Sequence, residues 1–267
     1  MTIRKHEKYF MNDPREANRL ALKVNPDDFI EKYLSSFVKD SSKVLDVGCG
    51  SGVITTALGK KFPNAIITGI DLNEDRFKKE NSSLDSNSNV NFIVGNARKL
   101  PFNNEYFDIV FIRFLLEYLK NPVEIIKEML RVLKYGGVIV LQDLDGQLCT
   151  HYPENNLLQT RLFKIIKYLE KDGFDPFIGR KLFSFLRSEK VTNISIEVNP
   201  YHLFAGSIDD HNLAIWDLKL DIALPEIAKA LESEESAITF KNDYLEFLKD
   251  AETLTFSNVF TVTGIKH

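Results

Sequence analysis

Glycine recurs at every second position after an apolar run early in the chain. The run covers residues 43–47, and Gly48, Gly50 and Gly52 follow it. Glycine tolerates backbone conformations that other residues avoid, and its missing side chain lets a ligand approach the main chain. A helical pattern begins at Val53, so unpaired N–H groups at the helix start would face that ligand. The segment predicts a buried strand, a tight turn and a helix start around a bound group.

A carboxylate follows the next apolar run. Residues 65–70 predict a neighbouring strand, and Asp71 stands at its end, nineteen residues after Gly52. There a carboxylate can accept hydrogen bonds from both hydroxyls of a ribose. Together with the glycine loop, Asp71 indicates a pocket for a cofactor that carries a nucleoside.

Two other phosphate-binding patterns fit less well. The dinucleotide fingerprint needs a third glycine where this chain has Val53, so a nicotinamide-dependent oxidoreductase is disfavoured. A nucleotide phosphate loop needs four residues after its first glycine, but six separate Gly52 from Gly59-Lys60. It also needs Ser or Thr at the position of Lys61.

The complete pattern resembles that of the class I S-adenosylmethionine-dependent methyltransferases. Asp46, the three glycines and the strand-end acid open it, and further matches continue to about residue 145. These matches are Val94-Gly95-Asn96-Ala97, Leu100-Pro101-Phe102, Tyr106 to Val110, Glu124 to Leu133 and Lys134 to Val140. Asn96 replaces the aspartate that the family most often has, although its amide oxygen can still accept from the adenine amine.

The resemblance implies S-adenosyl-L-methionine as cofactor and S-adenosyl-L-homocysteine as product. The residues that it implies at the cofactor are Tyr9, Arg19, Asp46, Gly48, Cys49, Gly50, Asp71, Leu72, Asn96, Ala97 and Arg113. Tyr9 and Arg19 belong to a Tyr…E-x-x-R-L element. This element and residues 175–182 resemble segments of a branch of the family that acts on small molecules. For Cys49, limited space in the loop explains the residue better than thiolate chemistry, because no histidine neighbours it.

A base near the strand ends would assist methyl transfer, because the acceptor loses a proton at some stage. His202 follows the predicted sixth strand, and His151 and Asp143 follow the fifth. We select His202 and His151 as candidate catalytic residues, with a surface or core role as the alternative for each histidine. The histidines show no metal-binding spacing, so no metal is predicted.

The elements that must position these residues alternate between strand and helix. Strands are predicted near residues 43–47, 66–70, 91–94, 108–112, 138–143, 194–198 and 259–265. Helices outside the core are predicted at Pro14–Leu22, Pro26–Val38, Asn156–Asp172, Phe177–Arg187, Ile208–Leu220 and Asp243–Glu252. Apolar strands with helices between them are typical of a parallel sheet. We expect an α/β, Rossmann-like fold with a seven-stranded, mostly parallel sheet and helices on both faces.

A single methyltransferase domain is expected over residues 1–267, because no linker interrupts the chain. Residues 1–40 are expected to form an N-terminal helical lid, and residues 41–145 the cofactor-binding core. Residues 146–267 should supply the last strands and helical inserts on the acceptor side. The inserts should cover the carboxyl edge of the sheet, where open α/β sheets bind ligands.

Composition narrows the function classes. The chain is 44% hydrophobic and 27% charged, with a net charge of −4, which is ordinary for a globular protein. No lysine or arginine block stands out, so no nucleic-acid partner is expected. No segment approaches the roughly 20 apolar residues of a membrane span. With only two cysteines, a reducing, cytoplasmic location fits.

The sequence therefore predicts transfer of a methyl group from S-adenosyl-L-methionine to an O or N atom of a small-molecule acceptor. The alternative is a protein that binds this cofactor without catalysis. Both interpretations require cofactor binding, and only turnover of an acceptor separates them. The sequence does not identify the acceptor, and it leaves the oligomeric state open.

Overall fold

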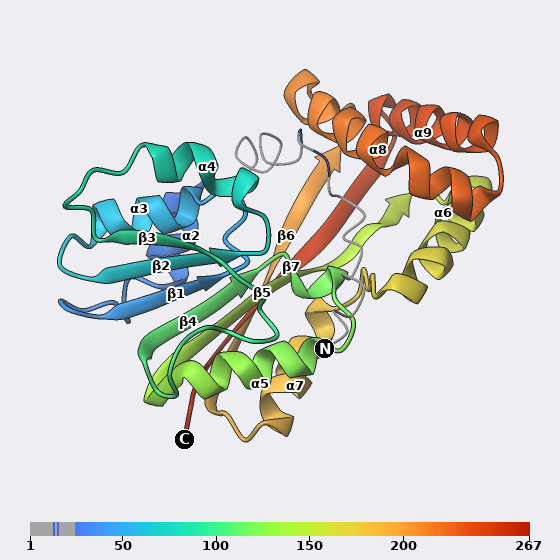
Figure 1. Cartoon of the computed structure of the whole chain (residues 1–267). Helices are drawn as coiled ribbons and strands as arrows, with labels where there is room; N and C mark the ends of the chain where they lie inside the picture. Colours follow the sequence, from blue (N-terminus) through green and yellow to red (C-terminus); the bar gives the residue numbers. More distant parts are fainter. Residues whose placement is uncertain (1–12, 14, 16–24) are drawn as a thin grey trace, which may run out of the picture.

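The computed structural model describes residues 13, 15 and 25–267 (Figure 1). In this part of the chain, seven strands form a sheet in the order β3-β2-β1-β4-β5-β7-β6. They are β1 (Lys43–Val47), β2 (Ile66–Asp71), β3 (Val90–Val94), β4 (Phe107–Arg113), β5 (Leu133–Tyr152), β6 (Thr192–Ala205) and β7 (Leu254–Ile265). Neighbours from β3 to β5 pair in parallel, and β7 runs antiparallel to β5 and β6. The expected seven-stranded, mostly parallel α/β fold is confirmed.

Helices cover both faces of the sheet because its strands are apolar on both sides. Val44 of β1 faces a core shared with α2 (Pro26–Tyr33) and α3 (Val53–Lys61). The next residue, Leu45, faces a core shared with α5 (Pro122–Val132) and α7 (Leu182–Ser188). Successive side chains of a strand point to opposite faces, so one buried strand supplies both cores. On the first face, α4 (Glu74–Ser82) stacks Phe77 on Phe92 of β3.

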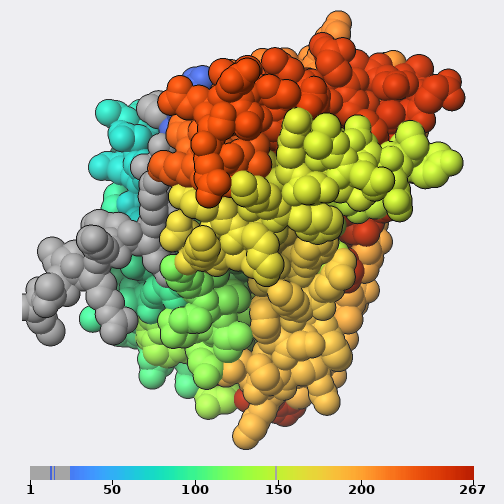
Figure 2. All heavy atoms as spheres, turned by 90° about the vertical axis from the view of Figure 1, so that its right-hand side faces the viewer, coloured from blue at the N-terminus to red at the C-terminus, as the bar shows by residue number. Residues whose placement is uncertain are grey.

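Three further helices form a separate layer, here called the helical unit. They are α6 (Asn156–Leu169), α8 (Asp210–Leu231) and α9 (Glu234–Lys249), beside the extended ends of β5, β6 and β7 (Figure 1). The unit has a hydrophobic core of its own, in which Trp216 and Tyr244 are buried. In the space-filling view, α8 and α9 (orange to red) lie at the top of the molecule above α6 (yellow) (Figure 2).

Short 3-10 turns connect these layers. They are η1 (Leu116–Tyr118) after β4, η2 (Glu170–Asp172) after α6 and η3 (Gly179–Lys181) before α7. The first of these turns follows the carboxyl end of β4, and its Tyr118 packs against the core of the helical unit. Among the described residues, no helix is both long and apolar enough to cross a membrane.

In the helical unit, the predicted range Asn156–Asp172 matches α6 followed by η2, but the predicted bounds of α8 and α9 were wrong. Helix α8 continues past the expected end at Leu220 and includes Pro225. Proline lacks an N–H and disfavours a helix interior, but burial of Leu220 and Ile227 holds this helix against its neighbours. Helix α9 begins at Glu234 rather than at residue 243, because the Ser233 side chain accepts a hydrogen bond from the Ser236 N–H.

Helix α2 is a layer of the fold rather than part of a lid. Ile30 is buried against the sheet, and the Phe29 ring centroid lies 5.7 Å from that of Phe111 in β4. An ion pair of 2.6 Å joins Lys32 to Glu197 of β6. The lid expected over residues 1–40 therefore excludes α2. Its other parts, including Tyr9, Arg19 and most of the predicted helix Pro14–Leu22, lie outside the described residues.

Candidate functional site

The glycine loop joins β1 to α3 and depends on its glycines. Gly48, Gly50 and Gly52 have φ angles of +73°, +54° and +77°, in the left-handed region that favours glycine. Space is limited as well, because a Cβ on Gly48 would lie 2.3 Å from Cδ2 of Leu115. The backbone N–H groups of Gly48 and Cys49 both donate to the Ile70 carbonyl, at 2.7 and 3.0 Å. The loop is thereby fixed to the end of β2.

Asp71 lies at the tip of β2 directly beside this loop. Only 5% of its surface is exposed. Its Oδ2 accepts from the Gly50 N–H at 3.0 Å, and its Oδ1 accepts from the Asn73 N–H at 3.0 Å. Arg76 Nη1 lies 3.5 Å from the same Oδ1. These contacts hold a buried carboxylate where the sequence predicts a ribose.

Asp46 lies beneath the loop, where its Oδ2 accepts from Thr55 Oγ1 at 2.7 Å. Burial raises the pKa of this carboxyl to about 7, and the charge of Asp71 adds to the rise. The Thr55 hydrogen bond and the charge of Arg113 oppose it. Asp46 thus connects the end of β1 to the first turn of α3.

The residues expected around adenine lie at the ends of β2 and β3. Leu72 exposes 54% of its surface directly after Asp71. The side-chain oxygen of Asn96 accepts from the Arg98 N–H at 2.9 Å, which closes a turn, and an amide oxygen has a second lone pair. Ala97 is partly buried against the core on the α5 face. An apolar side chain and an amide oxygen therefore flank the tip of β2.

Cys49 fits the space in the loop and is not activated. A Cβ placed on Gly69 would lie 3.0 Å from its sulfur, so the thiol fills the room above β2. Burial raises the pKa of this thiol well above its usual value, and the charges of Asp46 and Asp71 act in the same direction. The thiol therefore stays protonated, which disfavours nucleophilic chemistry.

Arg113 ends β4 between the loop and strand β6. Its Nε donates to Gln142 Oε1 at 2.5 Å, and it hydrogen-bonds Tyr201 of β6. Its guanidinium carbon lies 4.0 Å from the ring centroid of Phe114. Burial lowers the pKa of Arg113, while the charge of Asp46 is among the interactions that raise it. The arginine brings β6 close to the carboxyl edge of the parallel strands.

His202 lies next to this edge, at an irregularity in the pairing of β6 with β7. Its ring centroid is 4.4 Å from that of Tyr201 and 5.0 Å from that of Trp216 in α8. Phe204 is more distant, at 6.5 Å. Leu203, the next residue in the sequence, is exposed and does not pack on the His202 ring. Trp216 takes its place because α8 packs over this part of β6.

The hydrogen bonds of His202 define its tautomer. Ser257 Oγ donates to the Tyr201 carbonyl at 3.1 Å, so its one proton is already engaged. The ring Nδ1, 3.0 Å from the same Oγ, must therefore donate to it. In the neutral ring Nε2, which is buried, is then the nitrogen that can take up a proton.

His151 occupies a different place from His202. Its Nδ1 lies 3.0 Å from Thr255 Oγ1 of β7. Its ring centroid lies 5.6 Å from Tyr244 and 5.2 Å from Phe247, both in α9. These contacts place His151 between the sheet extension and the helical unit, in the core position that was its alternative.

Asp143 and Glu117 are two buried acids near this edge, and the sequence did not predict them as a pair. Asp143 Oδ2 accepts from the Glu117 N–H at 3.2 Å, and its Oδ1 accepts from the Leu144 N–H at 2.9 Å. Burial and the charge of Glu117 raise the pKa of Asp143 well above its usual value. The available signal was a glutamate inside the apolar segment 114–118, directly after β4.

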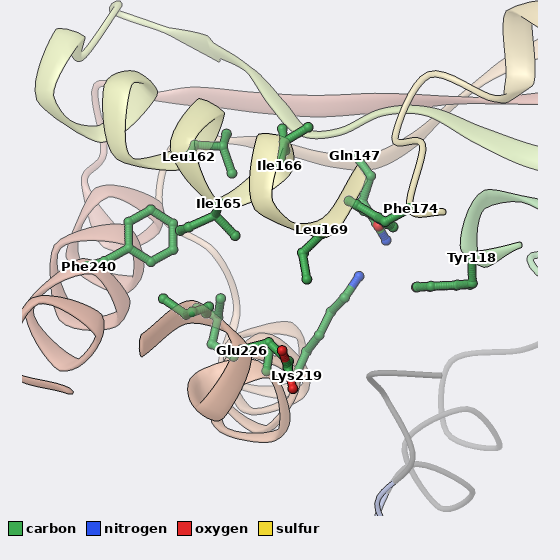
Figure 3. Close-up of a pocket in the computed structure, with 13 residues that line it drawn as sticks. Tyr118, Gln147, Leu162, Ile165, Ile166, Leu169, Phe174, Lys219, Glu226 and Phe240 are labelled. Carbon is green, nitrogen blue, oxygen red and sulfur yellow. The ribbon is translucent and has the colours of Figure 1, made fainter. Parts of the chain in front are cut away.

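A pocket lies between η1 and the helical unit (Figure 3). It contains about 600 Å³ of space not filled by protein atoms, part of which is open to solvent. Its lining residues are Tyr118, Gln147, Leu162, Ile165, Ile166, Leu169, Phe174, Lys219, Leu220, Ala223, Glu226, Ile227 and Phe240. They come from elements far apart in the sequence, so spacing in the chain does not reveal the pocket.

Known proteins share both the sequence pattern and the fold. Residues 45–141 match the family model described as a methyltransferase domain. An uncharacterized methyltransferase of Schizosaccharomyces pombe is 31% identical over 161 residues, which cover 56% of each chain. A demethylmenaquinone methyltransferase of Staphylococcus aureus is 40% identical over 104 residues, 39% of this chain and 43% of that protein. The matches span about half the length of these curated relatives.

Solved structures extend the likeness to the whole fold. A Haemonchus contortus phosphoethanolamine N-methyltransferase in complex with S-adenosyl-L-methionine has a TM-score of 0.61 at 14% identity, covering 100% of this chain and 60% of that one. A Streptomyces coelicolor geranyl diphosphate C-methyltransferase has a TM-score of 0.54 at 15% identity, covering 97% and 88%. Residues 45–141 thus match a methyltransferase domain, and the loop geometry and the shared fold support a class I S-adenosylmethionine-dependent methyltransferase.

Proposed function

We propose that this protein binds S-adenosyl-L-methionine and transfers its methyl group to an O or N atom of a small-molecule acceptor. The observation that carries the proposal is the Asp71 carboxylate, buried at the tip of β2 and held 3.0 Å from the Gly50 N–H of the glycine loop. This arrangement fits a ribose with two vicinal hydroxyls. It does not depend on the identity of the acceptor.

The residues around the loop fit the rest of the cofactor. The exposed Leu72 offers an apolar surface to an adenine ring, and Asn96 offers an amide oxygen to its amine. The positive-φ glycines leave the main chain open to close approach. Asp46 supports the loop from below through Thr55. When bound, S-adenosyl-L-methionine supplies a methyl group made electrophilic by its sulfonium.

The protein's own contribution is to position the acceptor and remove its proton. Holding two reactants in line can supply roughly 7–11 kcal/mol of a barrier. We assign His202 as the base, because Ser257 fixes its Nδ1 as the donor and leaves Nε2 to take the proton. His151 is a weaker candidate, since it packs against Tyr244 and Phe247.

A small-molecule acceptor is supported by the character of the site and its relatives. The names of similar proteins refer to demethylmenaquinone, phosphoethanolamine and geranyl diphosphate, all of them small molecules. The described part of the chain offers a partly open pocket lined mainly by apolar side chains, which is the usual character of small-molecule sites. The two free cysteines, Cys49 and Cys149, fit the reducing conditions of the cytoplasm.

Turnover distinguishes this proposal from cofactor binding without catalysis. The purified protein should carry S-adenosyl-L-methionine or S-adenosyl-L-homocysteine, detectable by mass spectrometry after denaturation. A screen of hydroxyl- and amine-bearing small molecules should then release S-adenosyl-L-homocysteine with at least one acceptor class. Tight cofactor binding with no turnover across the screen would favour the non-catalytic alternative.

A further inference from the structure

The pocket between η1 and the helical unit has walls of unequal polarity. Figure 3 shows Leu162, Ile165 and Phe240 grouped toward one end, and Tyr118 and Gln147 toward the other. The apolar end is formed by α6 and α9, whose side chains belong to the core of the helical unit. The polar end is formed by η1 and β5. Lys219 and Glu226 line the wall that α8 forms between these ends, and nearly all of the surface open to a ligand is apolar.

The charged groups around the pocket already have oppositely charged or polar partners. Lys219, which is 7% exposed, reaches across the pocket toward Gln147 (Figure 3). With the Gln147 amide oriented to satisfy its neighbours, its oxygen accepts from Lys219 Nζ and its nitrogen donates to Glu117 Oε2 at 3.2 Å. Glu226 Oε1 accepts from Lys229 Nζ at 2.9 Å. Burying a further charge here would be costly, so an uncharged ligand body fits best.

The polar end adjoins the proposed cofactor site through two sets of contacts. Leu115 packs on Gly48 of the glycine loop, and the Tyr118 N–H donates to the Leu115 carbonyl at 3.0 Å. On the other side, Trp216 contacts the His202 ring, and Lys219 Nζ lies 4.9 Å from the Trp216 ring centroid. A molecule in the pocket would thus direct its polar end toward the glycine loop and His202.

From this geometry, and resting on the proposed function, we infer the chemical class of the acceptor. It has an uncharged apolar body that enters the helical unit and a nucleophilic polar group at the other end. Hydroxylated aromatic or long-chain molecules belong to this class. The apolar body supplies the affinity, and the polar end is the site that receives the methyl group.

A series of 4-alkylphenols, from 4-methylphenol to 4-hexylphenol, tests the inference by calorimetry with saturating S-adenosyl-L-homocysteine. The dissociation constant should fall by about fourfold for each added methylene until the pocket is full. A charged probe of matched length, 3-(4-hydroxyphenyl)propionate, should bind at least about tenfold more weakly than 4-propylphenol, because its carboxylate would lose its hydration.

A pair of variants in α8 tests whether the dependence of binding on alkyl-chain length arises in this pocket. Ala223 lines the pocket, whereas Ala214 is exposed on the same helix. We expect Ala223→Phe to fill the pocket and reduce the dependence on chain length to within about twofold over the series. Ala214→Phe should keep the wild-type dependence, and both variants should bind S-adenosyl-L-homocysteine as the wild type does.

The outcomes separate this inference from the proposed function. If wild-type protein binds S-adenosyl-L-homocysteine but shows no dependence on alkyl length, or prefers the charged probe, the assigned acceptor class is wrong and the proposed function stands. Unchanged dependence in folded Ala223→Phe would also overturn the inference. If the wild type does not bind S-adenosyl-L-homocysteine, the proposed function fails first. The wild-type series decides the matter even where a variant does not fold.

Discussion

Individual residues at the carboxyl edge of the sheet combine burial with charge. Asp46, Asp71 and Asp143 are all nearly inaccessible to solvent, although each can carry a negative charge. Such groups are expensive to bury, and they often gather where a protein performs chemistry. The stabilising contacts differ, because Asp71 accepts two backbone hydrogen bonds while Asp46 accepts one from Thr55.

Asp46 should make the stability of the cofactor-free protein depend on pH. Its pKa rises from 3.8 to about 7 on folding, so the folded state holds a proton that the unfolded chain releases. The stabilisation is full below about pH 4 and is lost as the pH rises to about 7. Relative to wild type, Asp46→Asn should gain up to about 1.4 kcal/mol of unfolding free energy per pH unit across this range.

Urea unfolding at pH 5, 6 and 7 measures this difference. Glu74→Gln is a suitable control, because Glu74 is an exposed acid at the start of α4. The Asp46→Asn difference from wild type should change more with pH than the Glu74→Gln difference. A constant difference for Asp46→Asn would show that Asp46 titrates alike in the folded and unfolded states.

His202 should carry the proton-transfer step. Loss of a general base typically lowers a rate by 10²–10⁴-fold, and His202→Ala should show such a loss in kcat. The acidic limb of the pH–rate profile should also disappear, because the base no longer has to be deprotonated. His151→Ala is the matched comparison, because it removes a buried ring beside Tyr244 and Phe247. It should lower the free energy of unfolding and reduce kcat less than His202→Ala does. If both variants keep a kcat within about threefold of wild type and an unchanged acidic limb, positioning of the reactants is the better account of catalysis.

Secondary-structure elements show where sequence reasoning succeeded. Strands β1 to β4 lie within two residues of their predicted bounds, because each is a short apolar run with a glycine or polar stop. In β5 the prediction ended at Asp143, but the strand continues through Gly146 to Tyr152. Its extension pairs with β7, and such long-range pairing has no local signal. The predicted range of α8 ended too early for a related reason, since tertiary packing offsets the cost of Pro225 inside the helix.

The start of α9 can be tested directly. Ser233 accepts a hydrogen bond from the Ser236 N–H and so caps the helix. Ser233→Ala should lower the free energy of unfolding by about 0.5–2 kcal/mol, as measured by urea titration. Ser236→Ala keeps the backbone N–H and should cost less. Equal losses of unfolding free energy in both variants would show that the Ser233 cap does not stabilise α9.

On the scale of the whole molecule, the sheet edge and the helical unit enclose the proposed site from two sides. The proposed cofactor side was selected from the sequence alone, because its residues follow consecutive strands and match a family pattern. The acceptor side was not, because Tyr118, Gln147 and Lys219 come from η1, β5 and α8. Only the folded chain brings these three residues together.

We retain a ligand-dependent lid as a proposal for residues 1–24, which include Tyr9 and Arg19. Closure over an active site commonly accompanies ligand binding. Hydrogen exchange in this segment should slow by about tenfold or more with saturating S-adenosyl-L-homocysteine. Helix α2 serves as an internal control, because Phe29 and Ile30 already pack in the core. Equal exchange with and without ligand in residues 1–24 would count against a lid.

The most direct test of the central claim is calorimetric titration of S-adenosyl-L-homocysteine into the wild type, Asp71→Ala and Glu74→Ala. Asp71 is the buried acid at the loop, and Glu74 is an exposed acid three residues later. We predict binding by the wild type and by Glu74→Ala, and a loss of about 1–3 kcal/mol in folded Asp71→Ala through the missing hydrogen bonds to ribose. Equal affinity in all three proteins, or no binding by the wild type, would contradict the account.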